Sequence, residues 1–287
     1  DFQVSGTTME ILKMDPVRFL RYVNGLVFYL VLVAIAVVFL FPFFWVVFTS
    51  LQFPETASQV PPELLFTPTL DNFREVFSEG GFFICLWNSV VVVILTLLVN
   101  LLVSLPSAYV IARNRQRWMM FLILFLQMAP WITLLLPWYV IFKNLGLYDT
   151  RLGLVLSNLT FMIPFTIWLM LGFFEDVPVE VEEAAWLDGC SQIGTFIRIV
   201  VPLVKGGIIT ICTLGFMICW NIFLFPLVLS GYHTKTLPVF VYGFLADNQL
   251  DFGPLSAAAL LTTLPVIIFV LINQKYFKGG IAFGGSK

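Results

Sequence analysis

The sequence predicts an all-α integral membrane protein with six transmembrane helices, and three observations carry that prediction. Apolar residues make up 60% of the 287 residues and charged residues only 11%, whereas a soluble protein has roughly 25% charged residues. Six apolar stretches are long enough to cross a bilayer and contain no Asp, Glu, Lys or Arg. Lys and Arg gather in alternate connections between these stretches. We expect a single domain over 1–287, because no short repeat divides the chain.

The six predicted spans follow one another with connections of unequal length. They lie at 26–48, 82–106, 118–142, 152–174, 206–229 and 254–273. Several contain proline, among them Pro130 in the third, and we interpret these prolines as kinks, which helices in a bundle tolerate. The connections 49–81 and 230–253 are long enough to form structure, whereas 143–151 is a tight turn.

The distribution of basic residues predicts the orientation of the chain. Eleven Lys and Arg lie in the N-terminal segment, the loop after the second span, the loop 175–205 and the C-terminal tail, against four in the opposite connections. Cytoplasmic loops carry the excess of Lys and Arg. Both termini and the loop 175–205 are therefore predicted to be cytoplasmic. The first span is too long for a signal peptide and five more spans follow it.

The composition offers little for catalysis, so we expect no enzyme, metal site or cofactor in this chain. His233 is the single histidine, and the four cysteines form no C-x-x-C pair; three of them lie in apolar segments, where a buried thiol is the simpler interpretation. No phosphate-binding G-x-x-x-x-G-K-[ST] motif is present. A net charge of −2 gives no signal for binding nucleic acid.

The loop 175–205 is predicted to begin with a short helix. Pro178 suits the first turn of a helix, and Glu180, Glu182 and Glu183 complement the positive end of its dipole. Gly189 is a natural stop because glycine accepts the left-handed conformation that ends many helices.

A second helix is predicted to follow at once, which makes the loop a helix–turn–helix. Ser191 can cap it and Pro202 ends it. Its apolar residues share one face at helical spacing: Ile193, Phe196, Ile197 and Val200. One alternative is an amphipathic hairpin lying on the bilayer. Anionic headgroups would repel the acidic first turn, so a hairpin that docks in a cleft of another protein fits better.

Seven positions of this loop carry a specific resemblance. They are Glu183, Ala184, Ala185, Asp188, Gly189, Ile199 and Pro202. Their spacing resembles the EAA loop of permease subunits in bacterial ATP-binding-cassette importers, with Val201 in place of the more usual Leu. In that family the loop is the coupling helix that docks on a separate ATPase subunit, so the resemblance assigns ATPase coupling to these residues.

The resemblance extends over roughly 49–278 and is to the carbohydrate-uptake branch of the family, the maltose-transporter type. It is carried by Thr69–Phe73, Asn88-Ser89, Ala108-Tyr109, Ala112-Arg113, Leu145–Leu147 with Asp149-Thr150, Trp220-Asn221-x-Phe223, Thr236–Val239 and Leu264-Pro265. Two departures are Ile222, where the family often has an acid, and a tail without the usual closing Gly-Ala-x-Lys-Gly pattern.

This resemblance implies a permease subunit in the inner membrane of a bacterium or archaeon. It would pair with a second, related permease subunit, and two ATPase subunits that bind ATP and Mg²⁺ would dock on the cytoplasmic side. A solute-binding protein would dock on the outside. The implied cargo is a sugar, oligosaccharide or polyol.

Two other functions are weighed against this one. An ion-coupled secondary transporter usually places ionisable residues within the membrane, and the six spans contain no Asp, Glu, Lys or Arg; sodium coupling through carbonyls stays open. A membrane-embedded enzyme would need a nucleophile–base pair or a metal constellation. Purification together with an ATPase would favour the importer.

Two sets of candidate contact residues complete the predictions. Polar residues on one face of the second and fifth spans either join helices through hydrogen bonds, the simpler interpretation, or line the path of the solute. The candidates for the path are Asn100, Thr213, Met217, Trp220 and Asn221. The candidates for contact with the solute-binding protein, in the connection 230–253, are Asp247, Asn248 and Gln249.

Overall fold

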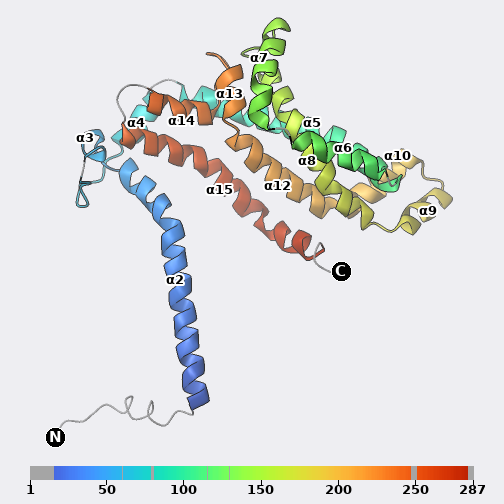
Figure 1. The fold of residues 1–287 in the computed structure, drawn as a ribbon, viewed down its shortest axis with the longest axis horizontal. Helices are drawn as coiled ribbons and strands as arrows, with labels where there is room; N and C mark the ends of the chain where they lie inside the picture. The colour runs from blue at the N-terminus through green and yellow to red at the C-terminus, as the bar shows by residue number, and fades with distance from the viewer. Residues whose placement is uncertain are drawn as a thin grey trace.

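The computed structural model describes residues 16–59, 61–78, 81–114, 116–128, 130–246 and 251–283. Within these residues every regular element is a helix, so the predicted all-α class is confirmed. The elements that span most of the molecule are α5 (Phe82–Arg113), α8 (Arg151–Glu175), α12 (Lys205–Asn221) and α15 (Phe252–Phe283). Figure 1 shows these four helices running side by side as the body of the molecule.

The centre of this bundle is the pair formed by α5 and α8, which pack on each other more extensively than any other two described elements. Polar side chains join the two helices. Asn100 Nδ2 donates a hydrogen bond of 2.7 Å to Thr166 Oγ1, and Ser104 Oγ donates one of 2.9 Å to Asn100 Oδ1. All three residues are fully buried. In an apolar environment such bonds hold helices together, so this face of α5 serves as the contact with α8.

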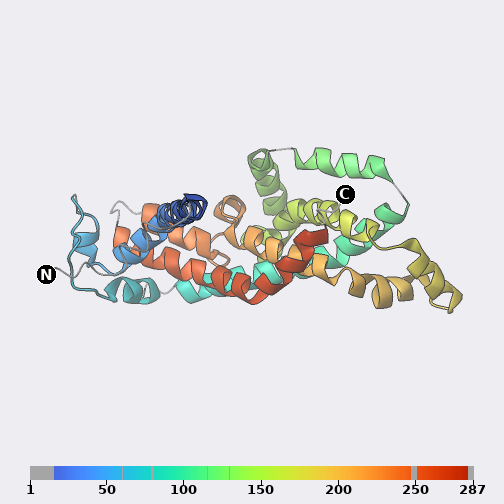
Figure 2. The ribbon, with the colours of Figure 1, turned by 90° about the horizontal axis from the view of Figure 1, so that it is seen from below.

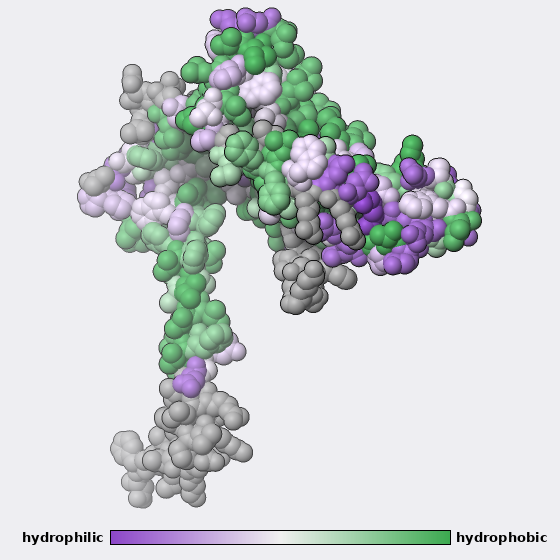
Figure 3. Space-filling model, turned by 45° about the vertical axis from the view of Figure 1, so that its right-hand side comes forward, coloured by the Kyte–Doolittle hydropathy of each residue, from purple (hydrophilic) through white to green (hydrophobic). Residues whose placement is uncertain are grey.

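Helix α2 (Pro16–Ser50) departs from the bundle. It packs on α15 near one end and then projects away from the body (Figure 1). The side of α2 that Figure 3 shows is largely hydrophobic, and nearly all residues from Leu26 to Val47 are exposed apolar residues. None of its apolar window is buried within the chain, whereas 61% of the corresponding window of α8 is. A helix that is apolar all round requires lipid or another protein around it.

A short segment returns the chain from α2 to the bundle through α3 (Pro54–Ala57) and α4 (Asp71–Ser78). Asn72 fixes this return. Its fully buried Nδ2 donates hydrogen bonds to the carbonyls of Ser50 at 2.8 Å and Gln52 at 2.6 Å. The close approach of Gly253 completes the packing, since a Cβ there would lie 2.4 Å from Asn72 Oδ1.

Four described helices are long and apolar enough to cross a membrane: Asn24–Ser50, Phe82–Arg113, Arg151–Glu175 and Phe252–Gln274. A fifth span is obtained if Gln192–Leu203 and Lys205–Asn221, which are bent by 74° at Val204, count together. The six-span topology and the placement of both termini in the cytoplasm therefore stay predictions.

The predicted third span, 118–142, is not one continuous helix. It contains α6 (Arg117–Gln127), a 3₁₀ turn η1 (Trp131–Leu134) and α7 (Leu135–Asn144). Pro130, with ψ 128°, leaves the helical region and separates α6 from the rest. Proline removes a backbone donor and disfavours helix in the residue before it. Figure 2 shows α6 at the edge of the bundle, where it packs on α8.

The predicted fifth span, 206–229, is also divided. Helix α12 ends at Asn221, Ile222 is extended with ψ 121°, and α13 (Leu224–Leu229) follows. The chain then reaches α14 (Leu237–Ala246), which packs against α5 and α15. The end of the bundle that holds α13 and α14 is opposite the end that holds the loop 175–205 (Figure 1).

Candidate coupling site at the end of the bundle

The loop 175–205 begins with α9 (Val179–Leu187), and the expected glycine ends it. Gly189 has φ +84°, in the left-handed region that favours glycine. The N–H of Gly189 donates to the carbonyl of Trp186, and that of Cys190 donates to the carbonyl of Ala185, both at 3.0 Å. The predicted helix and its stop are therefore confirmed.

The second half of the loop begins as predicted and then changes pitch. Ser191 Oγ accepts a hydrogen bond of 3.1 Å from Gly194 N–H and caps α10 (Gln192–Thr195). A π-helical turn, η2 (Phe196–Val200), and α11 (Val201–Leu203) follow before the bend into α12. The wider π turn rotates the later residues relative to the earlier ones. The predicted single apolar face is divided, with Val200 buried but Ile193 and Ile197 exposed.

One acidic side chain fixes α9 to the bundle. Glu182 is only 1% exposed, and its carboxylate accepts hydrogen bonds from Arg113 Nε at 2.7 Å and Tyr109 Oη at 2.5 Å. The Arg113 guanidinium also pairs with Glu182 Oε1 through its second nitrogen and donates to the Val177 carbonyl at 3.1 Å. We call these three side chains the anchor: Tyr109, Arg113 and Glu182.

The anchor corrects the expectation that the first turn of α9 exposes its acids. Glu180 and Glu183 are exposed, but Glu182 points inward and is neutralised by Arg113 from the end of α5. Its partners lie 69 and 73 residues earlier in the chain, so local spacing could not reveal them. The neighbouring Tyr109 and Arg113 were singled out by resemblance, without a role.

Aromatic packing surrounds the anchor. The Tyr109 ring lies 5.8 Å from that of Phe174 at the end of α8 and 5.0 Å from that of Phe196 in η2. Val177 and Val200 belong to the same buried cluster. The ends of α5 and α8, helix α9 and the π turn are therefore held together as one packed unit.

The tip of the hairpin presents most of the predicted coupling residues to the outside. Glu183, Ala184, Asp188, Gly189 and Pro202 are exposed, Ile199 is half-buried, and Ala185 is buried. Apolar side chains share this surface, above all Leu187, which is 90% exposed. Figure 3 shows hydrophilic and hydrophobic residues mixed at this end of the molecule. An exposed apolar tip rimmed by charge is typical of a surface that binds another protein.

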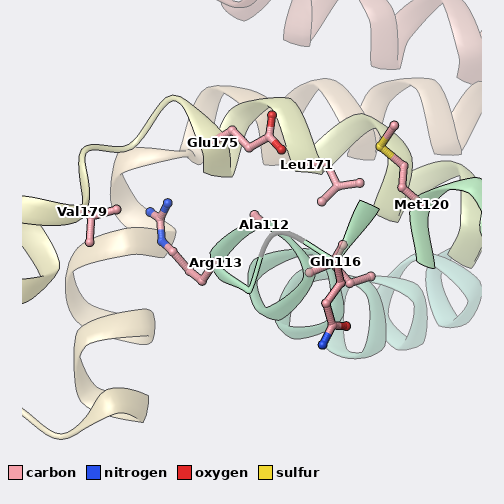
Figure 4. Close-up of a pocket in the computed structure, with 8 residues that line it drawn as sticks. Ala112, Arg113, Gln116, Met120, Leu171, Glu175 and Val179 are labelled. Atoms are coloured by element: carbon pink, nitrogen blue, oxygen red, sulfur yellow. The ribbon is translucent and has the colours of Figure 1, made fainter. Parts of the chain in front are cut away.

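A cavity of about 450 Å³ opens beside the anchor. Arg113, Gln116, Glu175 and Val179 line it together with apolar residues from α5, α6 and α8 (Figure 4). Arg113 points toward α9, and Glu175 stands across the cavity at the end of α8. The cavity lies where α5, α8 and α9 meet, so its shape depends on the position of α9.

The structure separates the candidate path residues into two groups. Asn100 and Thr213 are fully buried, and Trp220 is 2% exposed with its Nε1 donating to the Thr262 carbonyl at 3.0 Å. Met217 is 37% exposed and Asn221 is exposed, one turn apart on α12. In this conformation only the second group is accessible from outside the chain. The candidate contacts Asp247, Asn248 and Gln249 lie outside the described residues.

Most of the chain is similar to known proteins. The family described as "Binding-protein-dependent transport system inner membrane component" matches residues 100–282. The protein named "Probable ABC transporter permease protein y4oR" from Sinorhizobium fredii is 36% identical over 88% of this chain and 92% of its own. The trehalose transport system permease protein SugB from Mycobacterium tuberculosis is 32% identical over 86% and 92%.

A solved structure supports the fold. The crystal structure of a bacterial ABC transporter that imports the acidic polysaccharide alginate contains a chain that matches with a TM-score of 0.77. The match covers 89% of this chain and 97% of that one, at 22% sequence identity.

Proposed function

The chain belongs to the family of inner membrane components of binding-protein-dependent transport systems, and from this premise we propose that it couples to a separate ATPase through the hairpin 175–205. As an ATP-driven importer, the complete system would include two ATPase subunits that bind ATP and Mg²⁺. The observation that carries the proposal is the anchor. It holds α9 firmly on the bundle while the tip, with Leu187 and Gly189, stays free for a partner.

The test changes the turn at the tip. Proline fixes φ near about −65° and cannot adopt the φ of +84° at Gly189. We expect Gly189→Pro to insert into the membrane normally but to lose solute uptake and purification together with the ATPase. Gly206→Ala is the matched control, because Gly206 has a negative φ and open space around it. Full uptake by Gly189→Pro would overturn the proposal.

We further propose that the solute is a neutral carbohydrate or polyol. Relatives include a trehalose permease, and the predicted spans carry no charge to compensate an ionised solute. An unpaired charge at the bilayer centre costs at least about 3 kcal/mol. Asn221 offers an amide and Met217 an apolar contact on the open face of α12. Competition for uptake between a neutral sugar and its phosphorylated analogue tests this, and preference for the charged form would refute it.

A second permease subunit is proposed to complete the path. Two features support it: the exposed face of α12 around Asn221, and the apolar window of α2, none of which is buried by the rest of the described chain. The mass of the purified complex tests this pairing, and a complex with one permease chain would refute it.

The solute-binding protein is proposed to contact Asp247, Asn248 and Gln249. In the sequence these residues stand between α14 and α15, and the described helix α14 that precedes them lies at the end of the bundle opposite the hairpin. Replacing 247–250 with Gly-Ser residues should reduce stimulation of ATP hydrolysis by the binding protein, and an unchanged stimulation curve would remove this contact.

A further inference from the structure

A second set of polar contacts, most of them part-buried, lies at the end of the bundle opposite the anchor. Its centre is Asp149, which joins the turn after α7 to the start of α8. Asp149 has φ +53°, an uncommon conformation for a residue other than glycine. Its N–H donates to the Leu229 carbonyl at 3.0 Å, and Thr150 after it caps α8. The backbone thus holds the Asp149 side chain toward the segment that follows α13.

The Asp149 carboxylate gathers four hydrogen bonds from that segment. Oδ1 accepts from Gly231 N–H at 2.8 Å, Thr234 N–H at 3.0 Å and Thr234 Oγ1 at 2.7 Å, and Oδ2 accepts from His233 N–H at 3.2 Å. Gly231 permits this approach, because a Cβ there would lie 2.7 Å from Oδ2. A carboxylate ringed by backbone donors resembles an anion in a nest of N–H groups, except that the anion belongs to the chain itself.

The start of α5 holds the same segment. Asn88, fully buried, donates through Nδ2 to the carbonyls of His233 at 2.9 Å and Lys235 at 3.0 Å. Its Oδ1 accepts from Arg151 Nε at 2.9 Å, which ties the first turn of α8 to α5. Ser89 Oγ accepts from the N–H of Leu237, the first residue of α14, at 2.8 Å. We call Asn88, Ser89, Asp149 and Arg151 the clasp.

The clasp and the anchor lie at opposite ends of the same two helices. The clasp fixes the segment 230–237 to the beginnings of α5 and α8, and the anchor fixes α9 to the end of α5, beside the end of α8. Between them the two helices share the buried contact through Asn100 and Thr166. Densely packed elements move together rather than deform.

We propose that Asp149 is a positioning residue that makes the segment 230–237 and α14 move as one body with α5, α8 and the hairpin. Displacement of the hairpin tip thereby moves α14 at the opposite end of the bundle, and this motion does not depend on the exposed face of α12 around Asn221. The inference rests on the proposed coupling to an ATPase for its mechanical input. The rigid connection itself does not depend on that proposal.

Burial and hydrogen bonding act in opposite directions on Asp149. Burial raises the pKa of its carboxyl group, but the hydrogen bonds from Thr234 and from the N–H groups of Gly231 and His233 outweigh it and lower the pKa below the ordinary value. The side chain therefore stays ionised and accepts all four bonds at neutral pH.

The experiment compares two substitutions of Asp149 with a matched control. Asp149→Gly removes the carboxylate and suits a positive φ, so it isolates the side-chain bonds from backbone strain. Asp149→Asn keeps one oxygen and also tolerates this φ. Tyr232→Ala, in the same segment and 85% exposed, is the control.

Hydrogen exchange on the permease alone measures the protection of the amides that the clasp holds, without any transport partner. Asp149→Gly should accelerate exchange of the Gly231 and Thr234 amides at least tenfold, Asp149→Asn less, and Tyr232→Ala not at all. Unchanged protection in Asp149→Gly would overturn the clasp, whatever the fate of the proposed function.

Reconstitution with the ATPase and the solute-binding protein then reads the coupling. Asp149→Gly should keep assembly and basal ATP hydrolysis while uptake and stimulation by the binding protein fall at least fivefold, with partial recovery in Asp149→Asn. A parallel loss of assembly and basal hydrolysis would assign Asp149 to folding alone and overturn the positioning role. So would undiminished uptake. If the wild-type chain itself showed no uptake with these partners, the proposed function would fail while the exchange result still stood.

Discussion

Substitution of Glu182 by alanine removes the one acidic group that fixes α9 to the bundle. The carboxylate is 1% exposed and accepts two hydrogen bonds of 2.7 and 2.5 Å, from a guanidinium and a phenol. Removing one partner of a buried ion pair costs about 3–5 kcal/mol, because the other charge is left buried and unpaired. The Arg113 side chain is 17% exposed and keeps its bond to the Val177 carbonyl, so water can partly solvate it. We therefore expect the lower end of that range.

A loss of about 3 kcal/mol should appear as local opening of α9. With 1.4 kcal/mol for each factor of ten, the exchange rates of its protected amides should rise roughly 100-fold. Hydrogen exchange on the permease in lipid nanodiscs measures this directly. Glu180→Ala is the control, since Glu180 lies on the same helix but is exposed. Glu182→Gln keeps the acceptor for Tyr109 and should give an intermediate value.

A double-mutant cycle separates the pair from its surroundings. Arg113→Ala also loses the contact with Val177, so neither single substitution measures the ion pair alone. Residues in one ion-pair network show coupling energies of about 0.5–3 kcal/mol. For this geometry we expect at least about 1.5 kcal/mol between Arg113 and Glu182. Additive effects, or an α9 that exchanges at the wild-type rate in Glu182→Ala, would refute the reasoning.

Three further predictions concern other parts of the chain. Gly207→Ala should lower stability by about 1–3 kcal/mol, because a Cβ would lie 2.6 Å from the Phe173 ring, whereas the adjacent Gly206→Ala should not; equal thermal stability of the two variants would contradict this. Trp220→Phe should lower stability by about 1 kcal/mol through loss of its hydrogen bond without changing the apparent solute affinity. Asn221→Ala should weaken the apparent solute affinity without changing stability. Uptake titrations measure the affinity of both variants. Because the Asp149 pKa is lowered, the stability that the clasp contributes is present above the ordinary Asp pKa of about 3.9 and is lost as the pH falls through the lower pKa of the folded state. Protection of the Gly231 amide from hydrogen exchange should therefore be constant from about pH 8 to 5 and weaken only below about 4. Weakening near neutral pH would refute the assignment.

Much of the local structure could be predicted from the sequence. The second and fourth spans, expected at 82–106 and 152–174, are the helices Phe82–Arg113 and Arg151–Glu175. Both runs are long, apolar and free of charge, which favours a helix that is buried or in lipid, and neither is interrupted in the structure. The turn of the hairpin could be predicted from Gly189 and Ser191, because a positive φ and a helix cap are local features of the chain.

The predictions that were wrong depend on contacts between residues that are distant in the sequence. Pro130 was interpreted as a kink, but it breaks the helix. A helix in a bundle continues through proline only where neighbouring groups donate hydrogen bonds to the freed carbonyls, and the sequence alone does not show which groups lie there. Glu182 was assigned to the helix dipole, the nearest available cause, although its partners come from α5. Trp220 and Asn221 are adjacent in sequence, yet one is buried against α15 and the other is exposed.

The location of the four thiols has a practical consequence. Cys85 and Cys219 are buried, and Cys190 and Cys212 are both half-buried. Cys212 lies within the apolar helix α12, whereas Cys190 follows Gly189 at the tip of the hairpin, outside every predicted span. A water-soluble maleimide should therefore modify the unaltered chain first at Cys190. The proposed ATPase, seated on the tip, would shield that thiol, so the rate of labelling in native membranes would report the proposed docking. The wild-type protein thus carries its own reporter for this proposal.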